Sequence, residues 1–344
     1  MSLSTLGERF RKNIQTYIII IFLIATWGVF AIVTKGGYLS SQNISNLFRQ
    51  MTVTGFLASG MVLVMVTGGI DLSVGKMAGF VSVVVALFQR DVWIQMFPNQ
   101  PAISAVMSII LGLLVGSLYG AFQAWIIAYL RVPAFIATLG GMFIMNGGIL
   151  LVTGGQTIAA NQPVFSAIAQ GYLPSLAGWI LAAVVVAVLI FLMFNDRKTK
   201  AKYGFTPKPI IQDILKTAFF SFLIILYVYI VNQYNGVQVP VLILAVTVIA
   251  MSYISTNTRF GRYAYAIGGN REAARLSGIN IKKETFMIFT VMGLLCGLGG
   301  IVLASYVGYG TIAAGQGYEL DAIASCVLGG TSTLGGSGTI FGAM

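Results

Sequence analysis

The chain has 344 residues, of which 57% are hydrophobic and only 8% are charged, and its mean hydropathy is +0.89. A soluble domain carries about 25% charged residues, so these few charges cannot cover a water-exposed surface. The absence of histidine excludes Ser-His-Asp and Cys-His catalysis and the usual zinc sites. The net charge of +11 comes from short basic segments between apolar runs, which indicates orientation in a membrane and not nucleic-acid binding.

The apolar runs predict an all-α polytopic bundle, a single transmembrane domain over residues 1–344 with room for about nine or ten spans of ~20 residues. The first span is expected at residues 14–33. Three basic residues precede it and place the N-terminus in the cytoplasm: Arg9, Arg11 and Lys12.

The next apolar run, residues 51–87, is interrupted by TGGIDLSVG (Thr67–Gly75). Two glycines, an aspartate and a third glycine at membrane depth predict a broken helix. Irregular backbone is tolerated there only where it is buried in protein or lines a cavity. Asp71 in this break is either a pathway residue or a cap that accepts hydrogen bonds from the amides of Ser73 and Val74.

Arg90–Pro101 is expected to be an external loop with an interfacial Trp93. Further spans are predicted at residues 102–130, 133–152, 176–194, 217–231, 241–255 and 286–306. In this arrangement the basic segments at residues 197–208 and 259–283 lie in the cytoplasm. The chain ends in the apolar FGAM, so we expect one or two C-terminal spans to be missing from it. Two acids near this end, Glu319 and Asp321, are interpreted as caps of a final helix.

Three glycines recur every fourth residue in the span at residues 102–130: Gly112, Gly116 and Gly120. Such a ridge of small residues lets a neighbouring helix approach closely. The alternative is chance in a chain with 41 glycines.

The cytoplasmic segment Thr258–Phe286 is too long for a tight turn. Asn270 is a good N-cap, Glu272 suits the first turn, and Gly278 suits the end of a helix. These residues predict a short exposed helix at Arg271–Ser277 that lies across the membrane plane. It either inserts into a groove on another protein or is an inert connector.

AIGGNREAARLSGIN (Ala266–Asn280) resembles the coupling loop of ABC importer permeases, in the branch that serves monosaccharides such as ribose, xylose, galactose and arabinose. Three more stretches agree with that branch: Gly60–Gly75, Tyr129–Gly148 and Tyr318–Thr339. With GGYLSSQNISNLFRQ and NQYNGVQVPVLIL, the chain looks most similar to xylose-type or multiple-sugar permeases.

The resemblance implies a multi-pass protein of the bacterial inner membrane, in which two copies pair around one pathway. It also implies an external sugar-binding protein and a separate ATPase, which holds ATP and magnesium. This chain lacks a phosphate-binding loop with its lysine, and no catalytic residue, cofactor or metal is expected on it. The implied coupling helix consists of Gly269, Asn270, Arg271, Glu272, Ala273, Ala274, Arg275, Leu276, Ser277 and Gly278.

A sugar is neutral and rich in hydroxyls, so amides, hydroxyls and aromatic faces should line its path. The candidates are Asp71, Gln123, Trp125, Thr138, Asn146, Asn43, Asn46 and Gln50. Each could instead bond a neighbouring helix backbone. Two alternatives remain open: a permease for another small polar solute such as a nucleoside, and an ion-coupled secondary transporter. The second needs intramembrane ionisable residues, in which this chain is poor.

Overall fold

The computed structural model describes residues 14–205 and 209–344, and side chains from residue 21 onward. The basic residues Arg9, Arg11, Lys12 and Lys208 lie outside this part. Within it, eight helices are long and apolar enough to cross a membrane, which confirms the predicted all-α polytopic bundle. They are α3 (Ser41–Val66), α4 and its continuation (Val74–Met96), α6 (Pro101–Ala128), α7 (Ala134–Thr153), α9 (Ser175–Lys202), α10 (Ile210–Asn232), α11 (Val239–Asn257) and α14 (Ile281–Val307).

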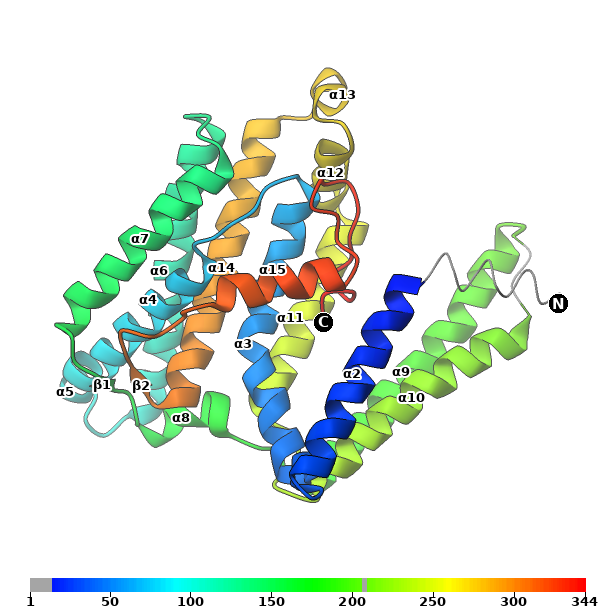
Figure 1. The fold of residues 1–344 in the computed structure, drawn as a ribbon, viewed down its shortest axis with the longest axis horizontal. Helices are drawn as coiled ribbons and strands as arrows, with labels where there is room; N and C mark the ends of the chain where they lie inside the picture. Colours follow the sequence, from blue (N-terminus) through cyan, green and yellow to red (C-terminus); the bar gives the residue numbers. More distant parts are fainter. Residues whose placement is uncertain (1–13, 206–208) are drawn as a thin grey trace. The chain divides into compact units, whose positions relative to one another are not determined.

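The chain forms two compact units (Figure 1). In its described part, the first unit contains residues 14–47 and 174–236, with α2 (Ile14–Val33), the short 3-10 helix Gly37–Leu39, α9 and α10. Helices α9 and α10 pack against each other, and Arg197 on α9 forms an ion pair with Asp213 on α10. The second unit contains residues 48–173 and 237–344, and it holds the candidate sites.

Helix α14 packs along α6 and α4 in the centre of the second unit. The glycine ridge of α6 makes this approach possible: a Cβ on Gly116 would lie 2.5 Å from the carbonyl oxygen of Gly293, and one on Gly120 would lie 2.7 Å from the Gly293 Cα. The ridge therefore serves close packing, as predicted, and is not a chance feature of a glycine-rich chain.

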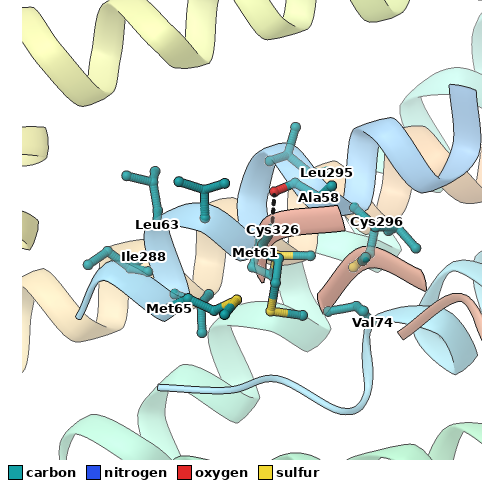
Figure 2. Packing of buried hydrophobic residues seen from close by; sticks show 14 of the residues in the cluster. Ala58, Met61, Leu63, Met65, Val74, Ile288, Leu295, Cys296 and Cys326 are labelled. Atoms are coloured by element: carbon teal, nitrogen blue, oxygen red, sulfur yellow. Dashed lines mark hydrogen bonds between the residues drawn. The ribbon is translucent and has the colours of Figure 1, made fainter. Parts of the chain in front are cut away.

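The core of the second unit lies where α3, α14 and the short α15 (Tyr318–Leu328) meet (Figure 2). Met61 from α3, Leu295 from α14 and Cys326 from α15 are at most 1% exposed. The Cys326 thiol donates a weak hydrogen bond to the carbonyl of Ala58, at 3.5 Å. Small or flexible side chains, such as Cys326, Ala58 and Met61, therefore form the contact between α15 and α3.

With 11 residues, α15 is too short to span a bilayer, and it runs across the spanning helices (Figure 1). The chain then folds back along the protein, where the Gly336 amide donates to the Val66 carbonyl at 2.8 Å. The capping role expected for Glu319 and Asp321 is wrong. The N-cap of α15 is Gly317 and no side chain caps it, although both acids lie in the first turn.

The loop expected at Arg90–Pro101 is shorter in the structure, where helical residues continue to Met96 and α6 begins at Pro101. Helix α4 (Val74–Leu87) continues through a π-helical turn (Phe88–Trp93) into α5 (Ile94–Met96), because Gln89 is buried and donates to Ser108 on α6 at 2.6 Å. Trp93 is 7% exposed and packs between Phe88 and Phe97, so it is not an exposed interfacial residue.

The segment between α7 and α9 also carries regular structure. It contains strand β1 (Ile158–Ala159) and helix α8 (Pro163–Gln170). β1 pairs antiparallel with β2 (Tyr309–Gly310), directly after α14. The Ser305 hydroxyl of α14 bonds the Phe165 carbonyl at 2.8 Å and the Ala169 amide at 2.9 Å, which holds α8 against α14.

Gly116→Ala should lower the free energy of unfolding by about 1–3 kcal/mol, the usual cost of overpacking, because the new Cβ meets the backbone of α14. Thermal unfolding of the full chain in detergent measures this change. Gly147→Ala is the matched control, since a Cβ there meets nothing within 4 Å and alanine favours a helix. Equal unfolding midpoints for the two variants would contradict the packing role.

Candidate translocation and coupling sites

The break between α3 and α4 covers Thr67–Ser73 and centres on a buried carboxylate. Asp71 is 3% exposed. Its Oδ1 accepts hydrogen bonds from the Ser73 amide at 2.8 Å, from the Ser73 hydroxyl at 2.6 Å, and from the Gln123 side-chain amide at 3.4 Å. The expected hydrogen bond from the Ser73 amide is present, but the N-cap of α4 is Ser73 and no side chain caps this helix, so the expected cap role is wrong. The Val74 amide is not among the donors to Asp71 in the described chain. The structure therefore supports a structural role for Asp71, and its pathway role stays a prediction.

Side chains from two neighbouring helices form hydrogen bonds with the break. Gln123 comes from α6, and its Oε1 accepts a hydrogen bond from the Ser73 hydroxyl at 3.1 Å. Thr138 comes from α7, where its hydroxyl accepts from the Leu72 amide at 3.2 Å and donates to the Ile70 carbonyl at 3.4 Å. The structure thus brings together three of the predicted pathway residues, Asp71, Gln123 and Thr138, and adds Ser73 to them.

The other pathway candidates do not join this cluster. Trp125 is 47% exposed on α6, and Asn146 and Gln50 are exposed on α7 and α3. Asn43, in the first unit, donates to the Tyr38 carbonyl at 2.8 Å and so satisfies a nearby backbone group, while Asn46 is half-buried. Their place on a translocation pathway remains a prediction.

The sequence reasoning overlooked a pair of opposite charges beside the break. Lys76 lies in the first turn of α4, and Glu319 lies in the first turn of α15, which packs against α4. Gly75 brings the two helices together, because a side chain there would overlap Glu319. The Glu319 Oε2 is buried and has no hydrogen-bond partner within the described residues. The sequence contains one indication of this feature, because Lys76 is the only basic residue in the apolar run 51–87.

The predicted coupling helix is present as α13 (Arg271–Leu276), one residue shorter than expected. The Asn270 side chain caps it by accepting from the Ala273 amide at 2.9 Å, and Gly278 follows it with a φ of +83°, which favours glycine. Apart from Ala274, its residues are exposed, and α13 stands beyond the ends of α12 and α14 (Figure 1).

Helix α12 (Arg259–Gly269), which the sequence analysis assigned to a loop, anchors α13. Gly261, Ala264 and Ile267 form its buried face. At its end, Gly268 lies against the Val66 carbonyl, where any larger residue would overlap the end of α3. The coupling helix is therefore only a few residues from the break.

A charged pair is displayed on the exposed face of α13. Arg275 forms two-point hydrogen bonds with Glu272, the shorter at 2.6 Å, and both side chains are more than 60% exposed. The hydrogen bonds from Arg275 lower the pKa of the Glu272 carboxyl, so it stays ionised at neutral pH. An exposed pair of this kind contributes little to stability, which leaves it available for a partner.

Residues 43–344, which include the break and the coupling helix, match the family described as the branched-chain amino acid transport system permease component. The chain belongs to this family. It is 39% identical to the xylose transport system permease proteins of Haemophilus influenzae and Escherichia coli K12, over 96% of this chain and 86% and 82% of theirs.

The ribose import permease protein of Escherichia coli K12 is 32% identical over 94% of this chain and 80% of its own length. No solved structure matches the chain. These relatives confirm the resemblance inferred from the sequence motifs, and together with the eight apolar helices they show that this is an integral membrane protein of the permease class.

Asp71→Ala should lower the free energy of unfolding by about 1–3 kcal/mol, because it leaves the buried donors of Ser73 and Gln123 without their acceptor. Asp71→Asn retains a side-chain oxygen and should lose less. Thermal unfolding in detergent compares the two with Asp91→Ala, which removes only an exposed ion pair with Arg90. The structural role of the Asp71 hydrogen bonds is refuted by an effect of Asp71→Ala no larger than that of Asp91→Ala.

Proposed function

We propose that this chain is the permease subunit of an ATP-driven ABC importer that carries xylose, or a closely related pentose, across the bacterial inner membrane. The observation that carries the proposal is the 39% identity to xylose permeases over 96% of the chain, against 32% for the ribose permease over 94%. A neutral sugar also agrees with a chain that has few charges in its spans.

A separate ATPase supplies the energy, with ATP and magnesium bound on that partner. Helix α13 is the element that docks on this ATPase, because α13 is exposed whereas the preceding helix α12 is packed against the bundle. A second copy of the chain completes the pathway, and an external binding protein delivers the sugar and sets the selectivity.

The proposed orientation places α13 and the basic residues around it in the cytoplasm. Arg131 at the α6–α7 turn, Arg271 on α13 and Lys282 at the start of α14 line one cavity at the same end of the second unit. This clustering agrees with the positive-inside rule. The N-terminus, with Arg9, Arg11 and Lys12, would lie on the same side of the membrane.

Helix α12 connects α13 to the end of α3, directly before the break. α13 follows α12 after one residue, and Gly268 of α12 packs on the carbonyl of Val66, the last residue of α3. The backbone between Thr67 and Ser73 is irregular. Thr138 bonds the Leu72 amide and the Ile70 carbonyl, and Gln123 bonds the side chains of Ser73 and Asp71. Movement of α13 on ATP binding would therefore be passed through α12 to the break between α3 and α4.

Uptake into proteoliposomes tests the transport activity. The permease is reconstituted with its ATPase and binding protein, and labelled xylose is expected to accumulate only when ATP is supplied inside. A nucleoside tested in the same assay distinguishes the alternative substrate class. Accumulation by the permease alone, driven by a proton or sodium gradient, would overturn the proposal in favour of a secondary transporter.

Glu272→Lys should lower ATP-dependent uptake by about tenfold or more while membrane insertion is unchanged, because it replaces the exposed carboxylate of α13 with a cation beside Arg275. Deletion of Arg271–Ser277 should abolish uptake. The matched control is Asp196→Lys, which makes a similar charge reversal in the exposed Asp196–Lys200 pair on α9. Uptake by Glu272→Lys equal to that of the control would rule out docking through α13.

A further inference from the structure

A cavity of about 490 Å³ opens beside the coupling helix, and we call it the basic cavity. Three segments that are distant in the sequence form its wall: the break at Thr67–Gly69, the end of α6 with the α6–α7 turn at 127–134, and the stretch from α12 to α14 at 267–289. Four cationic side chains lie in this wall: Arg131, Arg271, Arg275 and Lys282.

The basic cavity has an excess of positive charge that the described chain does not neutralise. No carboxylate lies among its lining residues. Arg275 is paired with Glu272, whereas Arg131, Arg271 and Lys282 have no ion-pair partner within residues 14–205 and 209–344. Like charges gathered in a concave site strengthen the local positive potential, so the cavity attracts an anion.

Apolar residues form much of the rest of the wall, together with Thr67 and Thr285, and the cavity lies at the ends of membrane-spanning helices. Ile127 near the end of α6, Ala134 at the start of α7 and Phe289 near the start of α14 contribute to it. The ends of spanning helices lie at the depth of the lipid headgroups. Basic cavities between helices on the cytoplasmic side bind anionic headgroups, whose phosphate meets the cations while the glycerol and acyl carbons meet the apolar wall.

We propose that the basic cavity binds a phosphate group, carried by an anionic phospholipid headgroup or by a free phosphate compound. A phosphate there lies between Arg271 of α13 and Arg131 of the α6–α7 turn, next to Gly68 in the break. It neutralises cations from separate segments and so ties the coupling helix to the helices that hold the break. Occupancy of the site therefore adjusts how readily α13 moves.

Binding to the purified full-length chain in uncharged detergent at low salt tests the site. The three probes are dihexanoyl phosphatidylglycerol, dihexanoyl phosphatidylcholine and inorganic phosphate, and thermophoresis gives the Kd of each. The cavity variant carries Arg131→Gln, Arg271→Gln and Lys282→Gln. The control variant carries Arg259→Gln, Arg262→Gln and Lys283→Gln, which remove equal charge from exposed positions outside the cavity.

We expect phosphatidylglycerol to bind more tightly than phosphatidylcholine, and the cavity variant to bind it about tenfold more weakly, or worse, while the control variant stays within about twofold of the parent. That result assigns the site to a lipid. The same pattern with inorganic phosphate in place of phosphatidylglycerol supports the site and assigns it to a free phosphate compound.

Two results would overturn the proposal. One is that the Kd of phosphatidylglycerol and the Kd of inorganic phosphate are both unchanged in the cavity variant. The cavity cations would then be available to bind an acidic surface of the ATPase instead. The other is equal weakening in the cavity and control variants, which would show charge attraction without a site. If the triple variant does not fold, Arg131→Gln alone gives the same comparison against Arg259→Gln. The measurement needs neither transport nor a partner, so its outcome is independent of the proposed substrate.

Discussion

Backbone that leaves a helix inside a membrane bundle must find its hydrogen-bond partners within the protein, and the break between α3 and α4 is where this constraint acts. Thr138 satisfies the amide of Leu72, and Gln123 bonds Ser73 and Asp71. The returning C-terminal segment supplies the Gly336 amide to the carbonyl of Val66. The positions of α6, α7 and the segment after α15 follow from the need to surround this interruption.

Close helix packing makes that arrangement possible. Gly116 and Gly120 let α6 touch the backbone of α14, and Gln123, one turn further along α6, then reaches the buried carboxylate of Asp71. On α4, Gly75 and Gly79 accept the segment that leads into α15. A larger residue at these positions would displace both the helix and the polar group that it carries, so the packing and the polar site depend on one another.

The same geometry links the proposed energy input to the pathway. α13 is exposed because a short amphipathic helix, α12, is anchored below it, and α12 ends on the backbone of Val66. The basic cavity lies between these elements and is lined by residues from each of them. The coupling helix, the break and the proposed phosphate site thus lie at one end of the second unit, because residues of α13 and of the break line the same cavity.

The sequence by itself determined the features that local chemistry controls. Hydropathy predicted the spanning helices, since a membrane requires long apolar helices, and Asn270 and Gly278 defined α13 because caps act within one turn. The interruption at Thr67–Ser73 could also be predicted, since glycines beside an acid rarely continue an apolar helix.

Only the tertiary structure decided which distant side chains meet. Asp71 joins Gln123 and Thr138, whereas Trp125 and Asn146, equally plausible from their residue types, remain exposed. The approach of Glu319 to the first turn of α4 depends on α15 lying across that helix. Gln89 contacts α6 and Trp93 is buried, although Trp93 lies in a segment that the sequence predicts to be a loop. These outcomes depend on packing between segments far apart in the chain, which no local pattern of residues records.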